Sequence, residues 1–344
     1  MKKPILPSEL IGEFFGVGSV GETDPKTPLA YVKPLKVPYA YELPIIREED
    51  MIRRFAALVD GFEEKGDFVM DVDMYTYREI TDDDSPLIVD ETHAHGLYLM
   101  VQNASYDFFK TQQAAPATMC FSTRGTDGRQ LVSKPMFHFY SSLMSRAAKG
   151  QVKHLSQYCK KIILCQDDPA LGFVVKMIGE ARGEGLTLKH VVQSTENVFP
   201  KETIPACHYC DDWRQLVKDD WYLLWDGPPK IVHIDLLSFN PEISPDHAER
   251  LNSFLEKGGS LALGILPNVD GGFSKSVVET LTRNLATVMQ SFHRSGVSVS
   301  LLSERTMIST QCGLSRASSS LTREIHEKNR EFPAILRNAM KRFT

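Results

Sequence analysis

The side chains best suited to chemistry stand together near the middle of the chain, in the run Cys207-His208-Tyr209-Cys210. This run closes an apolar segment and is followed by acidic residues. Imidazole and thiolate groups two residues apart at a strand end point the same way, which suits two corners of a zinc tetrahedron. We therefore expect His208 and Cys210 to bind a metal, and Cys207 to be a buried residue that faces away.

Two later residues are placed to complete such a site. Asp235 closes the apolar run IVHID, and Cys312 follows the run TMISTQ. Each stands at the end of a different predicted strand, and such ends converge over the mouth of a closed barrel, where (β/α)8 enzymes have their active sites. His233 lies on the same strand face as Asp235 and competes with it for the role of ligand. The sequence leaves that choice open.

Short apolar runs rich in Ile, Val and Leu alternate with amphipathic segments, a rhythm typical of parallel β/α units. The runs predicted as core strands are 10–15, 67–74, 161–166, 189–194, 203–209, 231–237, 261–267 and 306–310. Eight such strands would close a barrel, and barrels of this kind often occupy a chain of this length as one domain. We therefore predict an α/β fold in which residues 1–344 form a single (β/α)8 TIM barrel.

Three helices are predicted between the strands, at 168–182, 245–257 and 274–293. The second has the clearest ends, because Ser244 and Pro245 begin it and a glycine pair follows it. Residues 83–150 fit the β/α rhythm least well, since a Gly-Thr-Asp-Gly turn between two apolar runs favours an antiparallel hairpin. We predict that this segment is an insertion after the second strand.

Composition narrows the class of protein. The chain has 344 residues, 42% of them hydrophobic and 24% charged, as in ordinary globular proteins. The net charge is −5 and the basic residues are scattered, which argues against a nucleic-acid partner. We find no apolar run long enough for a signal peptide or a membrane span, and the six cysteines are too sparse for a disulfide framework. We expect a cytoplasmic protein with reduced thiols and no membrane contact.

The His-Tyr-Cys run, an acidic residue ending the next strand, and Cys312-Gly313-Leu314 together resemble the cobalamin-independent methionine synthase family. Two weaker features agree with this. The opening PSELIGEFF resembles that family's first-strand Ile-Gly-Ser-Phe signature, and Val192-Gln193 through Glu196 resembles its Ile-Gln-x-Asp-Glu strand. The resemblance covers most of the chain and is to the short members, which consist of the C-terminal catalytic barrel, in a superfamily shared with uroporphyrinogen decarboxylases.

The resemblance implies a zinc ion on His208, Cys210, Asp235 and Cys312, in a methyltransferase of methionine biosynthesis. The implied reaction transfers a methyl or larger alkyl group to homocysteine or a related small thiol, which is activated as a zinc-bound thiolate. A coordinating thiol is deprotonated by the cation and so becomes nucleophilic at neutral pH. The implied donor is a folate, such as 5-methyltetrahydrofolate, or a methylated corrinoid, which can be protein-bound.

The chain departs from the family pattern at several expected substrate positions. Glu13 replaces the serine after the first-strand Ile-Gly pair, and Thr195 leaves Glu196 as the only acid of its pair. The seventh strand runs into Asp270 and lacks the family's proton-donor histidine. This leaves assistance to the leaving group to Asp270, to another residue or to none, and we take Asp270 and Glu196 as the catalytic candidates. The substrate-binding residues expected at the barrel mouth are Glu13, Asp71, Asp73, Glu196 and Trp213.

Two other functions remain open from the sequence. A metal-free enzyme related to uroporphyrinogen decarboxylase would share the fold, but it would need basic residues for its substrate's carboxylates, whereas the expected mouth residues are acidic. A non-catalytic barrel with a structural zinc would instead hold its metal with four protein ligands.

Overall fold

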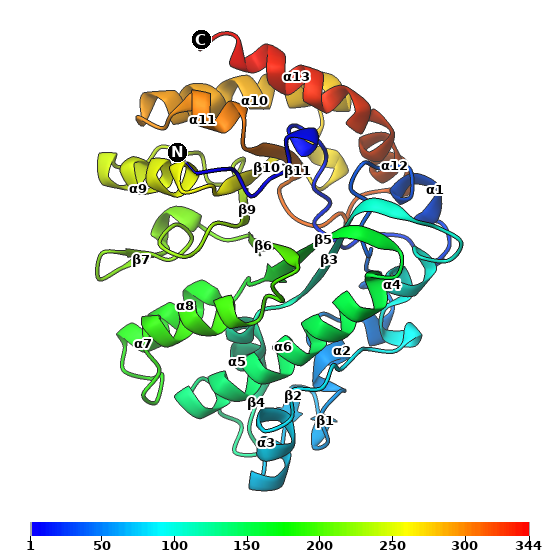
Figure 1. Cartoon of the computed structure of the whole chain (residues 1–344), viewed down its shortest axis with the longest axis vertical. Coiled ribbons are helices and arrows are strands. Elements are labelled where there is room, and N and C mark those ends of the chain that lie inside the picture. The colour runs from blue at the N-terminus through cyan, green and yellow to red at the C-terminus, as the bar shows by residue number, and fades with distance from the viewer. Residues whose placement is uncertain (1, 344) are drawn as a thin grey trace.

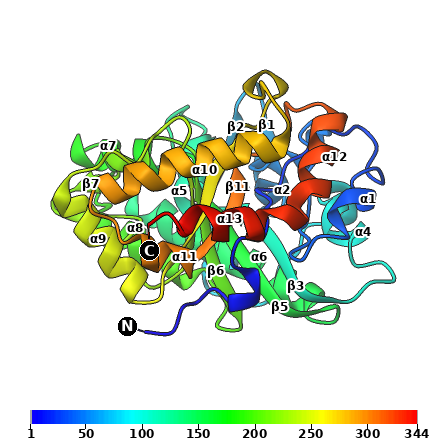
Figure 2. The ribbon, with the colours of Figure 1, turned by 90° about the horizontal axis from the view of Figure 1, so that it is seen from above.

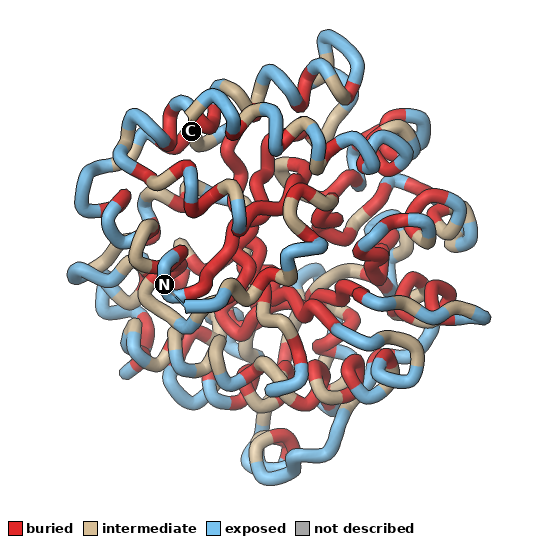
Figure 3. The backbone as a smooth tube through the Cα atoms, turned by 45° about the horizontal axis from the view of Figure 1, so that its top comes forward, coloured by how far each residue is buried: buried red, intermediate tan, exposed pale blue. Residues whose placement is uncertain are grey.

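The computed structural model describes residues 2–343 and is built around a curled, six-stranded parallel sheet (Figure 1). The strand order is β11-β10-β9-β6-β5-β3. These strands are β3 (Tyr106–Ala114), β5 (Cys159–Asp167), β6 (Thr203–Tyr209), β9 (Ile231–Asp235), β10 (Ser260–Leu266) and β11 (Thr306–Thr310). They are the most continuously buried part of the chain (Figure 3), as parallel strands covered by other elements are.

Helices cover the outer face of this sheet (Figures 1 and 2). The α-helices of residues 2–343 are α1 (Leu29–Val32), α2 (Arg53–Ala56), α3 (Met74–Thr81), α4 (His95–Leu99), α5 (Pro116–Ser122), α6 (Lys134–Leu155), α7 (Leu171–Gly179), α8 (Leu188–Asn197), α9 (Pro245–Glu256), α10 (Val277–Arg294), α11 (Val299–Ser303), α12 (Ser319–Lys328) and α13 (Phe332–Met340). The helices predicted at 168–182, 245–257 and 274–293 are confirmed as α7, α9 and α10. The predicted cap is also present, because the Ser244 hydroxyl accepts a hydrogen bond from the His247 amide at 3.3 Å.

Alternation along the strands divides the apolar residues between two faces. Side chains on the inner face form a small core cluster to which every strand of the sheet contributes, with Phe108, Ile163, Ala206, Ile231, Ala262 and Met307 among its members. The outward residues join the larger core beneath the helices. A residue of β6 therefore faces either the interior of the curl or the helical layer, and its position along the strand decides which.

Two extended segments near the N-terminus lie between β3 and β11, the edge strands of the sheet. Phe14 forms a parallel bridge to Ile308 of β11, and Tyr39 forms one to Lys110 of β3. The segments are joined to each other, since the Val20 amide donates to the Glu42 carbonyl at 2.9 Å. The prediction of a strand at 10–15 is therefore wrong, because only an isolated bridge forms there, and the structure shows a six-stranded curled sheet in place of eight continuous strands.

Two other predicted strands are also wrong. Residues 67–74 contain β2 (Phe68–Met70), which pairs with β1 (Phe62–Glu64) and β4 (Thr123–Arg124) in a separate small sheet. Residues 189–194 lie in helix α8, where the Thr187 side chain caps the first turn. A run with only two adjacent valines fits a helix face as well as a strand, and the cap decides for the helix.

The hairpin predicted within 83–150 is present only as a short antiparallel turn, in which the Gly125 amide donates to the Arg129 carbonyl at 2.9 Å, and the apolar runs on either side of it are helical. This stretch contains the edge strand β3 and the helices α5 and α6, each with a proline in its first turn. Only one antiparallel bridge, between Arg124 and Gln130, spans the predicted turn. Strand β3 was not predicted because several of its buried residues are polar, so it lacks the apolar run that marks a buried strand in the sequence. These polar residues are buried by bonds to other chain segments, such as Lys110 Nζ to the Val17 carbonyl at 2.7 Å. A two-stranded ribbon, β7 (Val217–Lys218) and β8 (Trp221–Tyr222), completes the elements.

Candidate metal centre

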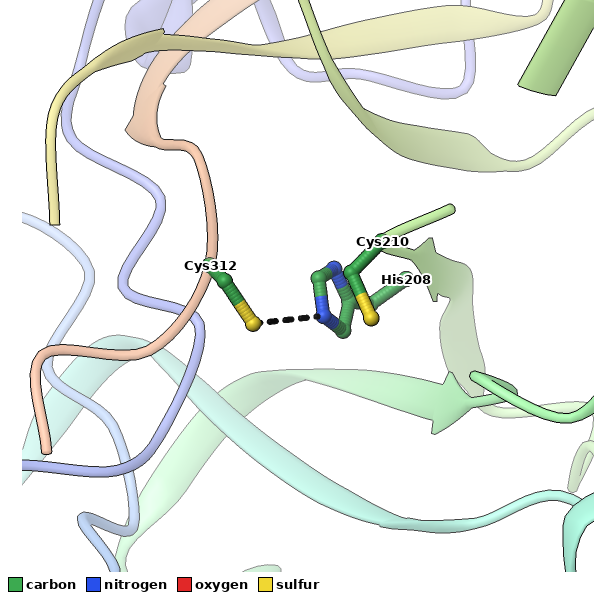
Figure 4. Close-up of side chains that lie close together, drawn as sticks. All are labelled: His208, Cys210 and Cys312. Atoms are coloured by element: carbon green, nitrogen blue, oxygen red, sulfur yellow. Dashed lines mark hydrogen bonds between the residues drawn. The ribbon is translucent and has the colours of Figure 1, made fainter. Parts of the chain in front are cut away.

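His208, Cys210 and Cys312 converge at the carboxyl ends of strands β6 and β11 (Figure 4). Their ligand atoms, one imidazole nitrogen and two sulfurs, all lie within 4.8 Å of one another. The Cys312 sulfur is 3.6 Å from His208 Nε2. Tetrahedral zinc with ordinary Zn–N and Zn–S bond lengths would hold these two atoms about 3.5 Å apart. The residues present therefore fit a zinc ion. The three candidate ligands named from the sequence lie together in the structure, although they are separated by up to 104 residues along the chain.

Neighbouring groups orient the imidazole of His208. Its Nδ1 lies 2.6 Å from Nδ1 of His233, and Nε2 of His233 lies 2.8 Å from the Thr310 carbonyl. That carbonyl can only accept, so His233 carries its proton on Nε2 and its Nδ1 accepts the proton of His208 Nδ1. Both rings are buried, and burial lowers the pKa of His233 well below its usual range. This chain of bonds directs His208 Nε2 toward the sulfurs.

The thiols of Cys210 and Cys312 interact through a hydrogen bond. The hydrogen bond from Cys210 lowers the pKa of Cys312 to about 4 against the opposing effect of burial, and the same bond, with burial, raises the pKa of Cys210. Burial disfavours charge on His208, but the neighbouring Cys312 sulfur outweighs it and raises the pKa of that imidazole. A bound cation would displace the thiol protons, because cysteine ligands must be deprotonated.

The loop after β11 positions Cys312 by contact with the N-terminal segment. The Leu314 amide donates to the Ser19 carbonyl at 2.8 Å, and the Thr310 hydroxyl donates to the Cys312 carbonyl at 2.7 Å. Gly313 approaches so closely that an added Cβ would lie 1.9 Å from Ser19 Oγ. A glycine next to the ligand is therefore a packing requirement.

Asp235 does not join the three ligands. Its carboxylate accepts hydrogen bonds from the amides of Leu237 and Ser238, each at 2.9 Å, and from the Gln311 side chain at 3.2 Å. It thus closes the loop that follows β9. His233, the competing candidate, has both ring nitrogens engaged and contacts His208 without joining the cluster. Within residues 2–343, no acidic side chain completes this group of three.

The residues predicted to bind substrate or transfer protons are dispersed. Asp71 and Asp73 are exposed, and Asp73 caps α3, at an end of the molecule far from β6 in Figure 1. Glu13 lies beside the middle of β11, where burial raises its pKa and Lys36 opposes that effect. Glu196 is on α8, where burial raises its pKa and Lys230 opposes the shift. The structure brings none of these four carboxylates into the group of three candidate metal ligands.

Two further predicted residues have structural roles. Trp213 is buried at 1% exposure, contacts Trp225, and donates from its indole nitrogen to the Phe239 carbonyl at 3.1 Å. Asp270 is exposed and accepts hydrogen bonds from the amide and hydroxyl of Ser318. These bonds lower the pKa of Asp270, so it is ionised at neutral pH and does not hold a proton to donate.

Comparison with known proteins leaves the family open. No protein-family model matches the chain, and no curated protein matches it. Among solved structures, it is similar to a B12-independent methionine synthase from Shewanella sp. W3-18-1 in complex with selenomethionine, at 13% identity and a TM-score of 0.46. The match covers 68% of this chain and 63% of that one, so the chain spans less than two thirds of that protein's length. Among residues 2–343, no helix combines the length and hydropathy that a membrane crossing requires.

Sequence reasoning missed Asp167, which ends β5 directly opposite His208 in the strand register. The carboxyl group is buried, and burial raises its pKa to about 6 while Lys110 and His208 oppose that effect. Its charge in turn raises the pKa of both His208 and Cys210. An acid directly after the apolar run KIILCQ was the available signal, because such a residue lies at the carboxyl edge of a parallel sheet.

Proposed function

We propose that this chain is a zinc-dependent transferase that moves a methyl or larger alkyl group to the sulfur of a small thiol, homocysteine or a related molecule. In this proposal the curled sheet and the two N-terminal segments act as a (β/α)8 barrel, and the donor is a folate or a methylated corrinoid. One observation carries the proposal: an imidazole nitrogen and two sulfurs lie within 4.8 Å of one another beyond the carboxyl ends of β6 and β11.

The number of ligands favours a catalytic over a structural metal. Structural zinc is usually closed by four protein ligands, whereas catalytic zinc keeps a position for substrate. The cluster described for residues 2–343 has three members, and the nearby carboxylate of Asp235 is engaged by backbone amides. Zinc in this site would supply a strong local field that lowers the pKa of a substrate thiol and makes it a nucleophile at neutral pH.

The reaction also requires residues of the chain to accept and donate protons. A sulfur–carbon bond forms as the bond between that carbon and the donor breaks, and the donor keeps the bonding electrons. The acceptor thiol loses a proton, and an amine leaving group takes one up. Asp167 is the residue suited to take up and release a proton near the centre, because burial raises its pKa to about 6, close to neutral pH. We infer that it takes the role first assigned to Asp270.

The centre gives less support to the metal-free alternative. A decarboxylase acting on a polycarboxylate would need several unpaired cations at the mouth. The charge of Lys110 acts on His208, but its ammonium group is engaged by the Val17 carbonyl and the Gln112 side chain. Thiols and an acid surround the remaining space, and they suit a soft cation better than a carboxylate-rich substrate.

Metal analysis of the purified chain tests the proposal. We expect about one zinc per chain, falling well below that for Cys210→Ser and for Cys312→Ser, with far-ultraviolet circular dichroism unchanged. Cys207→Ser is the matched control, because this thiol is buried on the outer face of β6 and should leave zinc content as it is.

X-ray absorption at the zinc edge then separates a catalytic from a structural metal. Adding homocysteine should add one sulfur to the first coordination sphere. Zinc-free protein with ordinary folding would exclude the function, and a coordination sphere that ignores added thiols would leave only a structural metal.

A further inference from the structure

A cavity lies on the outer face of the sheet; His208 is among its lining residues, but Cys210 and Cys312 are not. It has a volume of about 140 Å³ and lies between β5 and β6 on one side and α8 with the segment before β9 on the other. Strand β6 directs Cys207 and Tyr209 toward this side, whereas Ala206 belongs to the core cluster of the inner face, with His208 two residues further along. The apolar part of its lining includes Leu171, Val191, Phe199, Leu223 and Leu224.

Gln166 lines this cavity with a side chain that satisfies none of its bonding capacity. The residue is 0% exposed, and both its amide nitrogen and its amide oxygen lack a hydrogen-bond partner. Buried amides in folded proteins are nearly always paired, because an unpaired one loses its bonds to water without replacement. A ligand group beside Gln166 would satisfy this amide if it could both donate a hydrogen bond to its oxygen and accept one from its nitrogen.

Lys230 supplies a second unpaired group. Its side chain is nine-tenths buried, and its ammonium makes no hydrogen bond or ion pair with any of residues 2–343. Glu196 is nearby, since a Cβ on Gly227 would lie 2.9 Å from Lys230 Nζ and 3.2 Å from Glu196 Oε1, and the charge of Lys230 acts on its carboxyl group, but the two form no ion pair. The Lys230 nitrogen is not among the fully buried unpaired atoms, so it keeps access to solvent, and an anion that enters the cavity can reach it.

The two unpaired groups lie at different levels of the sheet. Gln166 pairs in register with Cys207, and Lys230 precedes Ile231, which pairs with Ala206. They are thus separated by two strand positions across the sheet, with apolar side chains between them. A ligand that satisfies both needs a polar group at each end and an apolar body.

We propose that this cavity binds a small aromatic monocarboxylate that carries a hydroxyl group at the opposite end of its ring. The carboxylate accepts from Lys230, the ring lies among the leucines, Val191 and Phe199, and the hydroxyl both donates to and accepts from the Gln166 amide. The size agrees, since an apolar cavity of roughly 150 Å³ accommodates benzene. The carboxylates of Glu196 and Asp168 at the cavity disfavour a dianion such as a phosphate ester.

Calorimetric titration of the full-length, chelator-treated protein with 4-hydroxybenzoate and with benzoate tests this assignment. We expect 4-hydroxybenzoate to bind more tightly than benzoate. Lys230→Met should weaken both by about tenfold or more, because a charge-assisted hydrogen bond is lost. Gln166→Leu should abolish the preference for the hydroxylated probe and leave benzoate binding nearly unchanged.

Two further variants locate the site and guard against misfolding. Cys312→Ser should bind 4-hydroxybenzoate like the parent chain, which separates this cavity from the metal centre and this inference from the proposed reaction. Gly227→Ala adds a methyl between Lys230 and Glu196 in a loop and should weaken binding while melting like the parent. Absence of binding at millimolar probe, equal affinity in Lys230→Met, or loss of binding in Cys312→Ser would each overturn the proposal.

Discussion

At the scale of single residues, the orientation of His208 in the candidate centre depends on hydrogen bonds to residues outside the centre. The Thr310 carbonyl determines which nitrogen of His233 carries the proton, and His233 determines the same for His208. Metal-binding histidines commonly have such a partner on the second ring nitrogen, and it fixes both ring orientation and ligand basicity. His233, proposed from sequence as a rival ligand, is therefore a positioning residue in the structure.

Replacing His233 tests this role. His233→Phe keeps a ring stacked against Phe15 but leaves the Nδ1 proton of His208 without an acceptor, so zinc affinity should fall by roughly 10- to 100-fold. Competition with a chromophoric chelator at neutral pH measures the change. His233→Gln retains an acceptor and a donor and should recover most of the affinity. Equal affinities in all three proteins would show that these hydrogen bonds have no effect on the metal.

At the scale of elements, the loop after β11 matters as much as the ligand it carries. Gly313 packs against Ser19, a residue of the N-terminal segment far away in sequence. A Cys-Gly pair therefore describes a contact between two chain segments as well as a ligand.

Gly313→Ala should displace Cys312 without changing any ligand. The new methyl would lie 1.9 Å from Ser19 Oγ, so the loop must move and zinc content should fall below half of the parent value. Ser19→Ala removes the oxygen that clashes, and the double variant should regain much of the metal. Zinc analysis of the two single variants and the double variant decides the matter, and an unchanged zinc content in Gly313→Ala would contradict the proposed contact.

Helix α12 makes stability depend on pH through a buried histidine. The His326 ring bonds to the Tyr39 hydroxyl at 2.7 Å and to the Thr322 carbonyl, and burial lowers its pKa to about 4. The unfolded chain takes up this proton below about pH 6.5, whereas the folded chain does so only near pH 4. The free energy of unfolding therefore falls as pH drops through that window, by about 2 kcal/mol between pH 7 and pH 5.

Urea unfolding of the parent and of His326→Gln at pH 7 and pH 5 measures this contribution. Glutamine does not titrate, so the variant should lose about 2 kcal/mol less than the parent between the two pH values. The difference between the proteins is the relevant quantity, because other titrating groups contribute equally to both. An identical pH dependence would show that His326 does not titrate as its burial implies.

At the scale of the whole molecule, the curled sheet depends on the N-terminal segments that lie between its edges. Glu42, on one of them, pairs with the buried Arg54 at 2.5 Å and accepts from the Gln112 side chain of β3 at 2.9 Å. This group of polar side chains lies within the fold where continuous strand pairing is absent. Its charges must remain paired for the segments to stay in place.

Breaking this ion pair should destabilise the entire chain. Arg54→Met leaves Glu42 charged and buried, and the free energy of unfolding should fall by about 3 to 5 kcal/mol. Arg54→Met combined with Glu42→Leu removes both charges and should recover a large part of that loss. Urea titration followed by circular dichroism gives both numbers. A single variant as stable as its parent would show that the pair contributes little to the fold.

Local patterns in the sequence were sufficient for the later half of the sheet. Runs such as 203–209 and 306–310 are apolar, short and bounded by turn residues, and each appears as the strand β6 or β11. The candidate metal ligands were predicted from residue type and position at strand ends, and the structure brings three of them together. The strands depend on neighbours within a few residues, which is the range over which sequence periodicity carries information.

Only the tertiary structure decided the remainder, because the deciding contacts join distant parts of the chain. His233 becomes an orienting group through partners 25 and 77 residues away, and Asp235 turns to its own loop. Glu196 lies in the outer helical layer, and not at the predicted barrel mouth, because residues 188–197 form the helix α8. The polar strand β3 is stable only where other segments satisfy its buried groups. No local pattern can state which of several chemically competent side chains such long-range packing will choose.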